Sequence, residues 1–595
     1  MGGWRGLGLG CLWLLTACQS GGSKPEGIST YRTASAHDVQ SWDPLLATDP
    51  FTRQILSATH ESLYQSAYLE DDHRIEPLLA AGMPQYSSDA LTVTIPIQKG
   101  IYFQPDPCWK KKSNSPRELV AQDFVTSFKR LALPWVNSPS RTLWSQRLMG
   151  FEAFQAHLAS GGNVEWAKRL AEGLSGVSAV GSHVLQIRLL REDPQLLHAL
   201  TQPWLAPLPS ELLQCATDAQ GRVLRPWSGT GAFRVSQWVR NQKIRLDRNP
   251  QFRKERYPTR GASQFFTLGL MEDAGKSIPF LDRLEFQIEP DSSLRWLSFL
   301  KGELEELAVP AQELSQVLIQ KSNLSPPFVQ KGLHLELQGA PVMQVLAMNM
   351  RDPVLGSHPG VRKAISASVN RELWIKKFTS GVAKKMKSIL PEGMGLQQVQ
   401  PGRLRWDYNP ELARQWLKKE GFPNGKGLPV FQLDLESMDP WDRKLGEFLV
   451  GQFKAVGIQC QLNLNSSETQ RQKAERGELQ LSLLRVSPES AEGLNLLERL
   501  SSPLDATHYQ NPSFDAWLEQ VAFSKSKAER LSLILKMDAL IQDEVPWVYG
   551  VQQSPVVLAQ PWLFNAHGSS WTLSPYKYLK VQREIQVRYE NERSD

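Results

Sequence analysis

The residue types that most often carry out chemistry are scattered along this chain. None of its ten histidines lies two or four residues from another, so no single helix or strand presents two imidazoles to one metal ion. The motifs of zinc peptidases, of serine hydrolases and of Walker-type phosphate-binding loops do not occur in the sequence. We therefore expect a protein that is not an enzyme and that holds neither a metal nor a cofactor.

One cysteine stands in a setting that does indicate chemistry. Cys18 follows Leu15-Thr16-Ala17, and residues 6–15 form an apolar stretch behind Arg5. About ten apolar residues are too few for a membrane-spanning helix, which needs about 20, and they are typical of a cleaved export signal. Small residues directly before a cysteine resemble the bacterial lipobox, in which that cysteine is lipidated and becomes the new N-terminus. We predict a signal peptide at 1–17, lipidation of Cys18, and a polar tether at 18–27.

The spacing of the other cysteines indicates no specific chemistry. Cys108, Cys215 and Cys460 are far apart and lack Cys-x-x-Cys spacing, which argues against a zinc ribbon or a redox dithiol. Export favours oxidation, which permits one disulfide and would leave one thiol over, but the sequence does not show whether the bond forms. The sequence leaves open which two of the three would pair.

Length and charge narrow the class of protein further. The chain has 595 residues, a length typical of three to four domains. Its 67 basic and 61 acidic residues leave a net charge of +6, and no block of five like charges occurs, so we expect no nucleic-acid partner. After the signal, no long uncharged apolar window follows, so we expect a chain anchored to a membrane and not threaded through it.

Hydrophobic periodicity predicts strands mixed with helices, which indicates the α/β class. The clearest predicted strands are 91–97, 184–189 and 244–247. The clearest predicted helices are 121–131, 360–378, 410–420, 442–456 and 526–543.

Several separated segments resemble the family-5 extracellular solute-binding proteins, the oligopeptide- and dipeptide-binding components of ABC importers. Their order and spacing cover roughly residues 40 to 560. They are Trp42-Asp43-Pro44, Asp89 to Phe103, Ala121 to Arg130, Gly229-Thr230-Gly231-Ala232-Phe233, Asp247-Arg248-Asn249-Pro250, Gly360 to Ser366, Tyr408-Asn409-Pro410 and Tyr509 to Asp515.

The resemblance implies a two-lobed periplasmic-binding-protein fold with a large extra subdomain and a ligand cleft between lobes joined by two hinge crossings. The implied lobe I is made of 28–65, 200–347 and 548–595, the extra subdomain of 66–199, and lobe II of 348–547. We expect the crossings near Asn349 and Trp547.

The resemblance also implies a ligand site where an apolar strand of lobe II ends, at Arg485-Val486-Ser487-Pro488-Glu489. In peptide-binding members this backbone pairs with an extended ligand, and a carboxylate meets the α-ammonium of the ligand. Here Val486 stands in place of an aromatic residue, and Glu489 falls at the carboxylate position. For each charged residue an alternative stays open. Glu489 either meets the ligand or is an exposed loop acid, and Arg485 either meets a ligand carboxylate or lies at the surface.

The resemblance thus implies an exported, lipid-anchored protein of the periplasm or cell surface that closes on oligopeptides and delivers them to the permease subunits of an importer. Two alternatives remain. The same scaffold could bind a non-peptide solute, or it could serve as a surface lipoprotein that acts as an adhesin, chaperone or sensor without transport.

Overall fold

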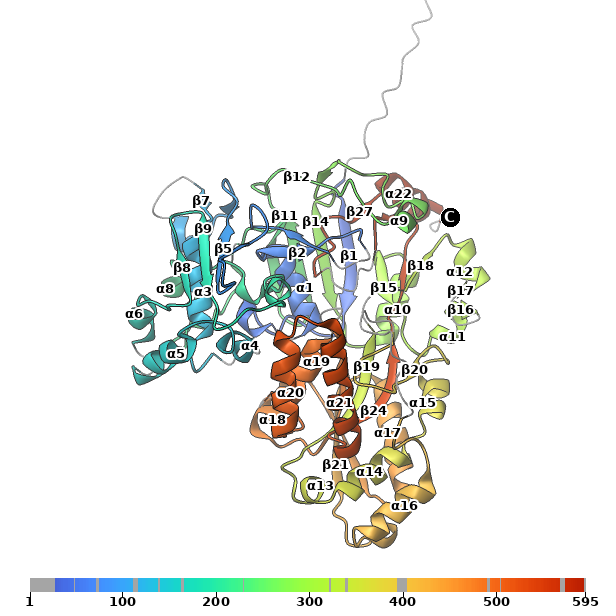
Figure 1. The fold of residues 1–595 in the computed structure, drawn as a ribbon. Coiled ribbons are helices and arrows are strands. Elements are labelled where there is room, and N and C mark those ends of the chain that lie inside the picture. The colour runs from blue at the N-terminus through green and yellow to red at the C-terminus, as the bar shows by residue number, and fades with distance from the viewer. Residues whose placement is uncertain are drawn as a thin grey trace, which may run out of the picture.

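The computed structural model describes residues 27–592, except for 48, 71–73, 111–115, 137, 139, 162–164, 228, 320–322, 338–340, 393–403, 489–492, 503–504 and 568–572. The chain forms three parts, which we call lobe I, the extra subdomain and lobe II (Figure 1). Cys18 and Glu489 lie outside the described residues. Among the residues described, no helix combines the length and the apolar character needed to cross a membrane.

Lobe I is built on a four-stranded sheet with the order β1-β14-β11-β10. Its strands are β1 (Thr30–Ser35), β10 (Phe233–Val239), β11 (Lys243–Arg248) and β14 (Arg283–Ile288). Helix α1 (Pro50–Thr59) shares their core, and α22 (Arg583–Glu592) ends the chain. A second sheet of three strands, in the order β15-β25-β18, consists of β15 (Glu306–Ala308), β18 (His334–Leu337) and β25 (Val556–Ala559).

The extra subdomain contains a four-stranded sheet in the order β4-β5-β9-β8, from β4 (Gln85–Tyr86), β5 (Thr92–Pro96), β8 (Val177–Ala179) and β9 (Val184–Arg188). Helix α3 (Ala121–Leu131) packs on it, and α4 (Arg141–Ser145), α5 (Phe151–Ser160) and α6 (Trp166–Leu170) follow. One continuous hydrophobic core reaches from Leu45 to Trp227. The boundaries expected at 66 and 199 therefore fall inside this core, because segments on both sides of them pack into it.

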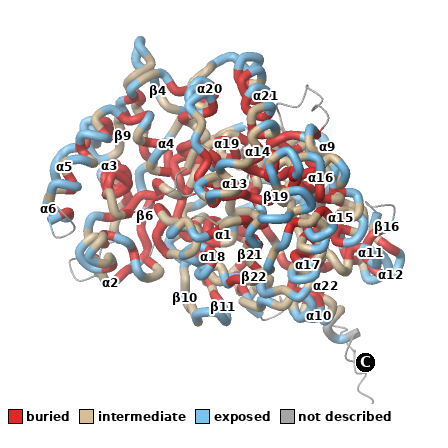
Figure 2. Tube along the Cα trace, turned by 90° about the horizontal axis from the view of Figure 1, so that it is seen from below, coloured by how far each residue is buried: buried red, intermediate tan, exposed pale blue. Residues whose placement is uncertain are grey.

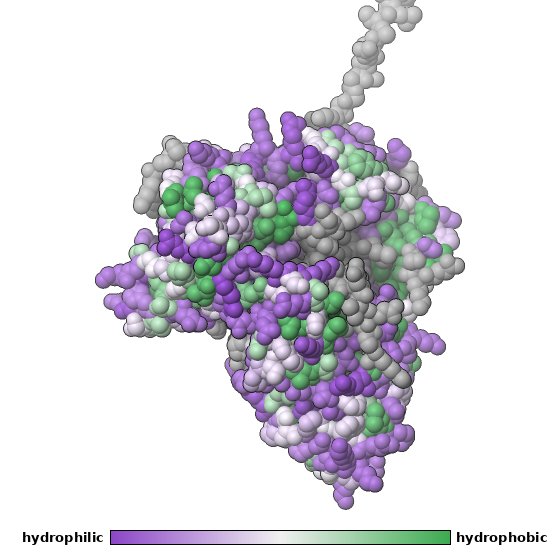
Figure 3. All heavy atoms as spheres, viewed as in Figure 1, coloured by the Kyte–Doolittle hydropathy of each residue, from purple (hydrophilic) through white to green (hydrophobic). Residues whose placement is uncertain are grey.

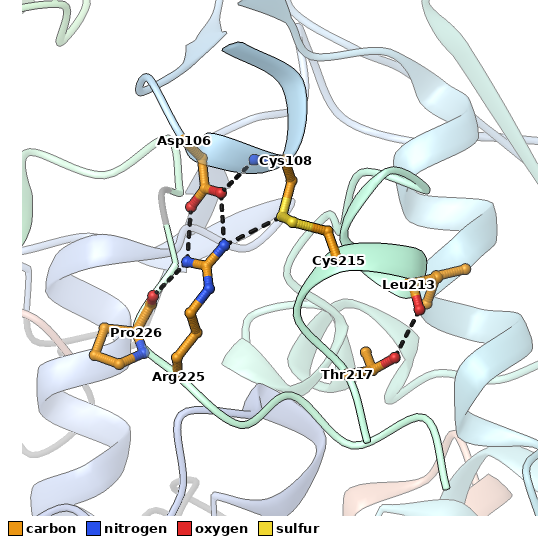
Figure 4. The surroundings of a disulfide bond; sticks show 7 residues. All are labelled: Asp106, Cys108, Leu213, Cys215, Thr217, Arg225 and Pro226. Carbon is orange, nitrogen blue, oxygen red and sulfur yellow. Dashed lines mark hydrogen bonds and ion pairs between the residues drawn. A yellow bond between two sulfur atoms is a disulfide. The ribbon is translucent and has the colours of Figure 1, made fainter. Parts of the chain in front are cut away.

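A disulfide joins Cys108 in α2 (Pro107–Lys110) to Cys215 in α8 (Leu212–Cys215), and Cys460 is a free thiol. Arg225 lies beside it and donates hydrogen bonds to Asp106 at 2.7 Å and to the Cys108 sulfur at 3.1 Å (Figure 4). The bond and the ion pair together fasten the rim of the extra subdomain to the chain segment that returns to lobe I.

Lobe II is built on a six-stranded sheet in the order β20-β24-β19-β23-β21-β22. Its strands are β19 (Val342–Met348), β20 (Lys384–Lys385), β21 (Phe431–Glu436), β22 (Cys460–Asn465), β23 (Leu481–Val486) and β24 (Trp547–Gln553). Two hydrophobic cores cover its two faces. On one lie α14 (Pro359–Ser368), α15 (Arg371–Phe378), α16 (Pro410–Lys419) and α17 (Pro440–Lys454). On the other lie α18 (Ser467–Arg476), α19 (Leu494–Ser501), α20 (Pro512–Phe523) and α21 (Lys527–Glu544).

The chain passes between the sheets of the two lobes at two places. It leaves lobe I after β18, which ends at Leu337, and has entered lobe II where β19 begins at Val342; it leaves β24 of lobe II for β25 of lobe I at 554–555. The positions expected from sequence, Asn349 and Trp547, are wrong as crossing points. Both fall after the first crossing and before the second, because the whole of β19 and β24 pairs within the sheet of lobe II.

Buried residues run through the interior of each part, and exposed residues gather on the outer helices such as α5 and α6 (Figure 2). The cores of the two lobes are separate clusters. Each lobe therefore has an interior of its own, as rigid-body movement about the two crossings requires.

Candidate functional site

The edge of the lobe II sheet that faces lobe I has the form of a binding crevice. Strands β21, β22 and β23 run parallel, so their carboxyl ends lie at one edge. Helix α17 connects β21 to β22 and packs on one face of the sheet. Helix α18 connects β22 to β23, on the far side of β21, and packs on the other face. Ligands of open α/β sheets bind at such a switch point, outside the carboxyl ends of the strands. Here that point lies between β21 and β23.

At its carboxyl end, strand β23 extends beyond the last residue that pairs with its neighbour β21. Its register with β21 ends at the pair Leu435–Leu483, whereas its register with β19 continues to the pair Met343–Val486. Within the described part of the chain, no strand pairs with the other edge of Arg485 and Val486. The backbone of these two residues can therefore accept an added strand from a ligand.

The predicted site residues have different surroundings. The Arg485 guanidinium forms an ion pair with Asp442, which lies in the first turn of α17. Val486 is 4% exposed, and its side chain packs in the core of lobe II, so this side chain is not available to a ligand. The Ser487 carbonyl accepts a hydrogen bond from the Asn495 side chain at 3.0 Å. The part of Glu489 stays a prediction, because this residue lies outside those described.

The two lobes touch beside this crevice. Asp439 caps the N-terminus of α17 by accepting from the Trp441 amide at 2.8 Å, and it also accepts from the Ser292 amide at 3.3 Å. Ser292 opens helix α10 (Ser292–Leu300) of lobe I, so one carboxylate serves the N-termini of two helices in different lobes. On the other face of the sheet, the hydroxyl of Ser467 lies 3.3 Å from the ring of His37 in lobe I. The two lobes therefore touch at both faces of the sheet.

Burial at this junction also affects Arg295 in α10. Burial lowers the pKa of its guanidinium, and the negative charges of Asp439 and Glu289 act in the opposite direction. The guanidinium donates to the Pro290 carbonyl at 2.9 Å. Positive charge of lobe I thus faces acidic residues of lobe II across the junction.

A cavity of about 710 Å³ opens next to the α17 end of the crevice. Lobe I contributes Gln312 and Ser315 to its walls, and lobe II contributes Lys376, Lys377 and Trp441, among others. Neither lysine has an ion-pair partner among the described residues. Because both lobes form the walls, the shape of the cavity depends on lobe closure, and the two lysines make it suitable for an anionic group.

A second contact joins the extra subdomain to lobe II, and we call it the Phe523 contact. Arg191 pairs with Glu519 of α20 at 2.5 Å, and Lys525 pairs with Glu192 at 2.6 Å. The Arg191 guanidinium also lies 3.7 Å from the centre of the Phe523 ring. The adjacent residues Arg191 and Glu192 of the extra subdomain thus pair with residues of opposite charge on lobe II, beside the ring of Phe523.

Comparison with known proteins identifies the scaffold. The profile described as bacterial extracellular solute-binding proteins, family 5 Middle, matches residues 74–507. The chain belongs to this family. The heme-binding protein A of Haemophilus influenzae is 23% identical over 488 residues, which are 80% of this chain and 78% of that protein. The dipeptide-binding protein of Escherichia coli K12 is 22% identical over 479 residues, 78% of each chain.

Solved structures share the fold of this family member. The periplasmic binding protein DppA from Helicobacter pylori, in complex with the peptide STSA, matches with a TM-score of 0.72 at 19% identity over 93% of this chain and 98% of that one. A periplasmic oligopeptide-binding protein from Borrelia burgdorferi matches with a TM-score of 0.75 at 17% identity, over 93% and 100% of the two chains. The two-lobed solute-binding fold expected from the sequence is confirmed.

Asn349 and Trp547, the two residues expected at the hinge, make their contacts inside lobe II. The Asn349 side chain donates to the carbonyl oxygens of Leu479 at 2.8 Å and Gly477 at 3.2 Å, which ties the end of β19 to the start of β23. Trp547 is 2% exposed and packs with the α19–α21 side of the sheet. Both residues hold lobe II together on the lobe II side of the crossings.

Sequence reasoning missed the groups that join the parts. Asp439 had a local signal, because an aspartate before Pro440 is a typical helix N-cap, but its second partner Ser292 lies 147 residues away. Arg191 and Glu519 are 328 residues apart and have no local signal at all. Among the residues described, no cluster of three or more metal-ligating side chains is present.

Proposed function

We propose that this protein is a lipid-anchored, extracytoplasmic binding protein that captures oligopeptides by hinge closure and passes them to the permease subunits of an ABC importer. The observation that carries the proposal is the edge of Arg485 and Val486, with which no strand among the described residues pairs, at the switch point of the lobe II sheet and beside the contact between the lobes. An edge of this kind binds main-chain amides and carbonyls, the groups that all peptides share.

The termini of the ligand would be read by charge. Asp442 already neutralises Arg485, so the free lysines Lys376 and Lys377 are better placed to receive a peptide carboxylate. We assign Glu489 to the α-ammonium, as the resemblance implied. Pro488 has no amide hydrogen and cannot donate to the ligand, so the pairing would depend on its neighbours.

Anchoring and location form part of the same proposal. Cys18 would carry the lipid that holds the protein at a bacterial membrane, with the folded body outside the cytoplasm. The disulfide between Cys108 and Cys215 supports this location, because disulfides persist in oxidising compartments.

The test of the ligand class is competitive capture. The purified mature chain is incubated with a random peptide library, and the peptides that remain bound after gel filtration are identified by mass spectrometry. Parallel samples receive hemin, because one relative is named for heme binding. Enrichment of peptides by main-chain length and termini supports the proposal. Saturable hemin binding without peptide enrichment would overturn it in favour of a non-peptide solute.

Two substitutions test how the termini are read. Glu489→Gln should weaken binding of a captured free-amine peptide on the order of 30-fold, because truncating one partner of a buried charge pair costs about 2–5 kcal/mol. N-acetylated peptides should lose much less. The pair Lys376→Gln and Lys377→Gln should weaken free-acid peptides more than amidated ones, and Lys426→Gln, at an exposed site of lobe II, serves as the control. Equal losses for both forms of a peptide would remove that residue from the site.

A further inference from the structure

The connection between two neighbouring strands of lobe I is much longer than the fold needs. Strands β11 and β14 lie side by side and antiparallel, so a hairpin loop of two to five residues could join them. Instead the chain makes an excursion from residue 249 to residue 282, which contains β12 (Glu255–Arg256), α9 (Ser263–Thr267) and β13 (Ser277–Ile278). We call this segment the β11–β14 excursion. Connections of this length inside a compact domain often serve a function of their own.

The excursion is held firmly by a small core of its own. Phe265 and Tyr257 are each 1% exposed and pack with Tyr68 and Tyr578, whose rings stack at 4.1 Å. Asp273 is buried and accepts hydrogen bonds from Lys580 at 2.9 Å and from Asn565 at 2.9 Å. Contacts from distant parts of the chain thus fix the base of the excursion. The part that carries Phe266 and Leu268, which we call its tip, therefore takes a defined position.

That tip presents large apolar side chains to solvent. Phe266 is 60% exposed and Leu268 is 66% exposed, although the preceding residue, Phe265, is buried. Exposed apolar pairs of this kind on a rigid support mark interaction sites. The space-filling view shows apolar patches at this end of the molecule (Figure 3).

The surroundings of the tip carry more positive than negative charge. Lys254, Arg256 and Arg260 are exposed on the excursion, whereas Lys276 forms an ion pair with Asp273. Glu272 is its exposed acid, since Asp273 is already paired with Lys580 and Lys276. An apolar tip with basic neighbours fits a surface that is apolar inside and anionic outside, which is the chemistry of a bilayer with acidic headgroups.

The N-terminal segment leaves lobe I next to the same excursion. The Ser29 amide donates to the Asp282 carboxylate at 3.0 Å, and the Asp282 amide donates back to the Ser29 carbonyl at 2.9 Å. Asp282 is the last residue of the excursion. Ile28, directly before this pair, is 52% exposed. The start of the described chain, α9 and α22 all lie at the upper end of the molecule, away from lobe II (Figure 1).

The length of the remaining chain limits how far this end can stand from a membrane. Between Cys18 and Ile28 the sequence has room for an extended span of at most about 35 Å, at roughly 3.3–3.6 Å per residue. If Cys18 carries the anchor, the end of lobe I with the excursion is therefore the part of the body nearest to the bilayer.

We propose that the tip of the β11–β14 excursion is a membrane-contacting element, and that its partner is the surface of an anionic lipid bilayer. Phe266 and Leu268 enter the interfacial layer, and Arg256, Arg260 and their basic neighbours face the phosphates. The orientation part of the reasoning rests on the proposed lipidation of Cys18, whereas the chemistry of the tip does not. The tip would act as a second, weaker attachment that sets the orientation of lobe I on the membrane.

The experiment uses the whole mature chain carrying Cys18→Ser, so that no acyl group contributes to binding. The chain is sedimented with vesicles of phosphatidylcholine alone and with vesicles of equal parts phosphatidylcholine and phosphatidylglycerol. We expect binding to the anionic vesicles, a loss on the order of tenfold for the double variant Phe266→Ser/Leu268→Ser, and no loss for Val430→Ser, which is 57% exposed on lobe II. Arg256→Glu/Arg260→Glu should lower binding to anionic vesicles, and added salt should do the same.

A second readout keeps the proposal falsifiable if the serine variants are poorly folded. Phe266→Cys in a Cys460→Ser background, labelled with an environment-sensitive fluorophore, places one probe at the tip, and its emission should shift to shorter wavelength when anionic vesicles are added. Equal vesicle binding by the parent chain and the double serine variant, or a probe that stays in water, would overturn the proposal and point to a protein partner. Fatty-acid labelling of Cys18 in cells is scored separately, so failure of the anchor and failure of the tip give different results.

Discussion

The Phe523 contact predicts that the extra subdomain takes part in lobe closure. The substitution Arg191→Ala removes the ion pair with Glu519 and the guanidinium that covers the Phe523 ring. Both charged side chains are about half exposed, at 41% and 53%, so the ion pair contributes only about 0.2–1 kcal/mol. The stacked guanidinium adds about 0.5–1 kcal/mol. We therefore expect a loss of about 1–2 kcal/mol.

This loss should act on the opening of the cleft and leave the folding of the parts unchanged. Arg191 and Phe523 belong to different parts, and each part keeps its own core when the contact separates. Since about 1.4 kcal/mol corresponds to a tenfold change, the ratio of closed to open molecules should fall roughly 5- to 30-fold. The apparent affinity for any ligand that binds the closed form should fall by a similar factor when the closed state is the minor one.

The assay is a distance measurement between spin labels on the extra subdomain and lobe II. Labels at Val180→Cys and Val430→Cys, both exposed, in a Cys460→Ser background report the separation of the two parts. Arg191→Ala should shift the population toward longer distances, and high salt should do so in the parent chain. The matched control is Arg222→Ala, which breaks an exposed ion pair with Asp218 at 2.7 Å inside the extra subdomain. Identical distance distributions for Arg191→Ala and its parent, with and without salt, would refute the reasoning.

Three further outcomes follow from single features. Cys18→Ser should abolish fatty-acid labelling and leave the protein without its anchor; equal labelling of mutant and parent in cells would contradict the lipoprotein assignment. Replacing Cys108 and Cys215 by alanine should lower the free energy of unfolding by about 2–4 kcal/mol, because the bond closes a loop with a sequence separation of 107 residues, and denaturant titration in oxidising buffer measures the change. Burial lowers the pKa of His60 to about 3, from about 6.5 in an unfolded chain, so the unfolded state binds more protons between these values and stability falls as the pH falls. From pH 6.5 to pH 5 the free energy of unfolding should fall by about 2 kcal/mol through His60 alone. If the free energy of unfolding of a His60→Gln chain fell as steeply with pH, this role of His60 would be disproved.

Local signals predicted the elements well wherever capping residues marked their ends. Asn409 followed by Pro410 predicts the start of α16, and the structure has Asn409 as the N-cap with its side chain accepting from the Leu412 amide. The predicted helix 360–378 is in fact two helices. Asn370 caps the second of them, and the apolar periodicity continues across the break, which hides it from a periodicity search.

Features that depend on distant segments could not be predicted in the same way. The resemblance placed the crossings near Asn349 and Trp547, but the pairing of β19 and β24 with their neighbours, which the sequence does not reveal, decides which lobe each strand belongs to. The disulfide pair stayed open because spacing says nothing about which cysteines the fold brings together. Val486 was expected in the segment that follows an apolar strand, and the structure has it as the last residue of β23; its burial depends on neighbours from β19 and α19 that the sequence does not reveal.

The second crossing has a consequence for the order in which the protein folds. Strand β24 lies between β20 and β19 in the sheet of lobe II, and β25 is the middle strand of the three-stranded sheet of lobe I. Both come from residues 547–559, so neither sheet is complete until the last tenth of the chain has been delivered. A chain truncated at residue 546 would lack a strand in each lobe, and synthesis from the N-terminus leaves these strands until last. Both lobes can therefore complete their sheets only when this C-terminal segment arrives.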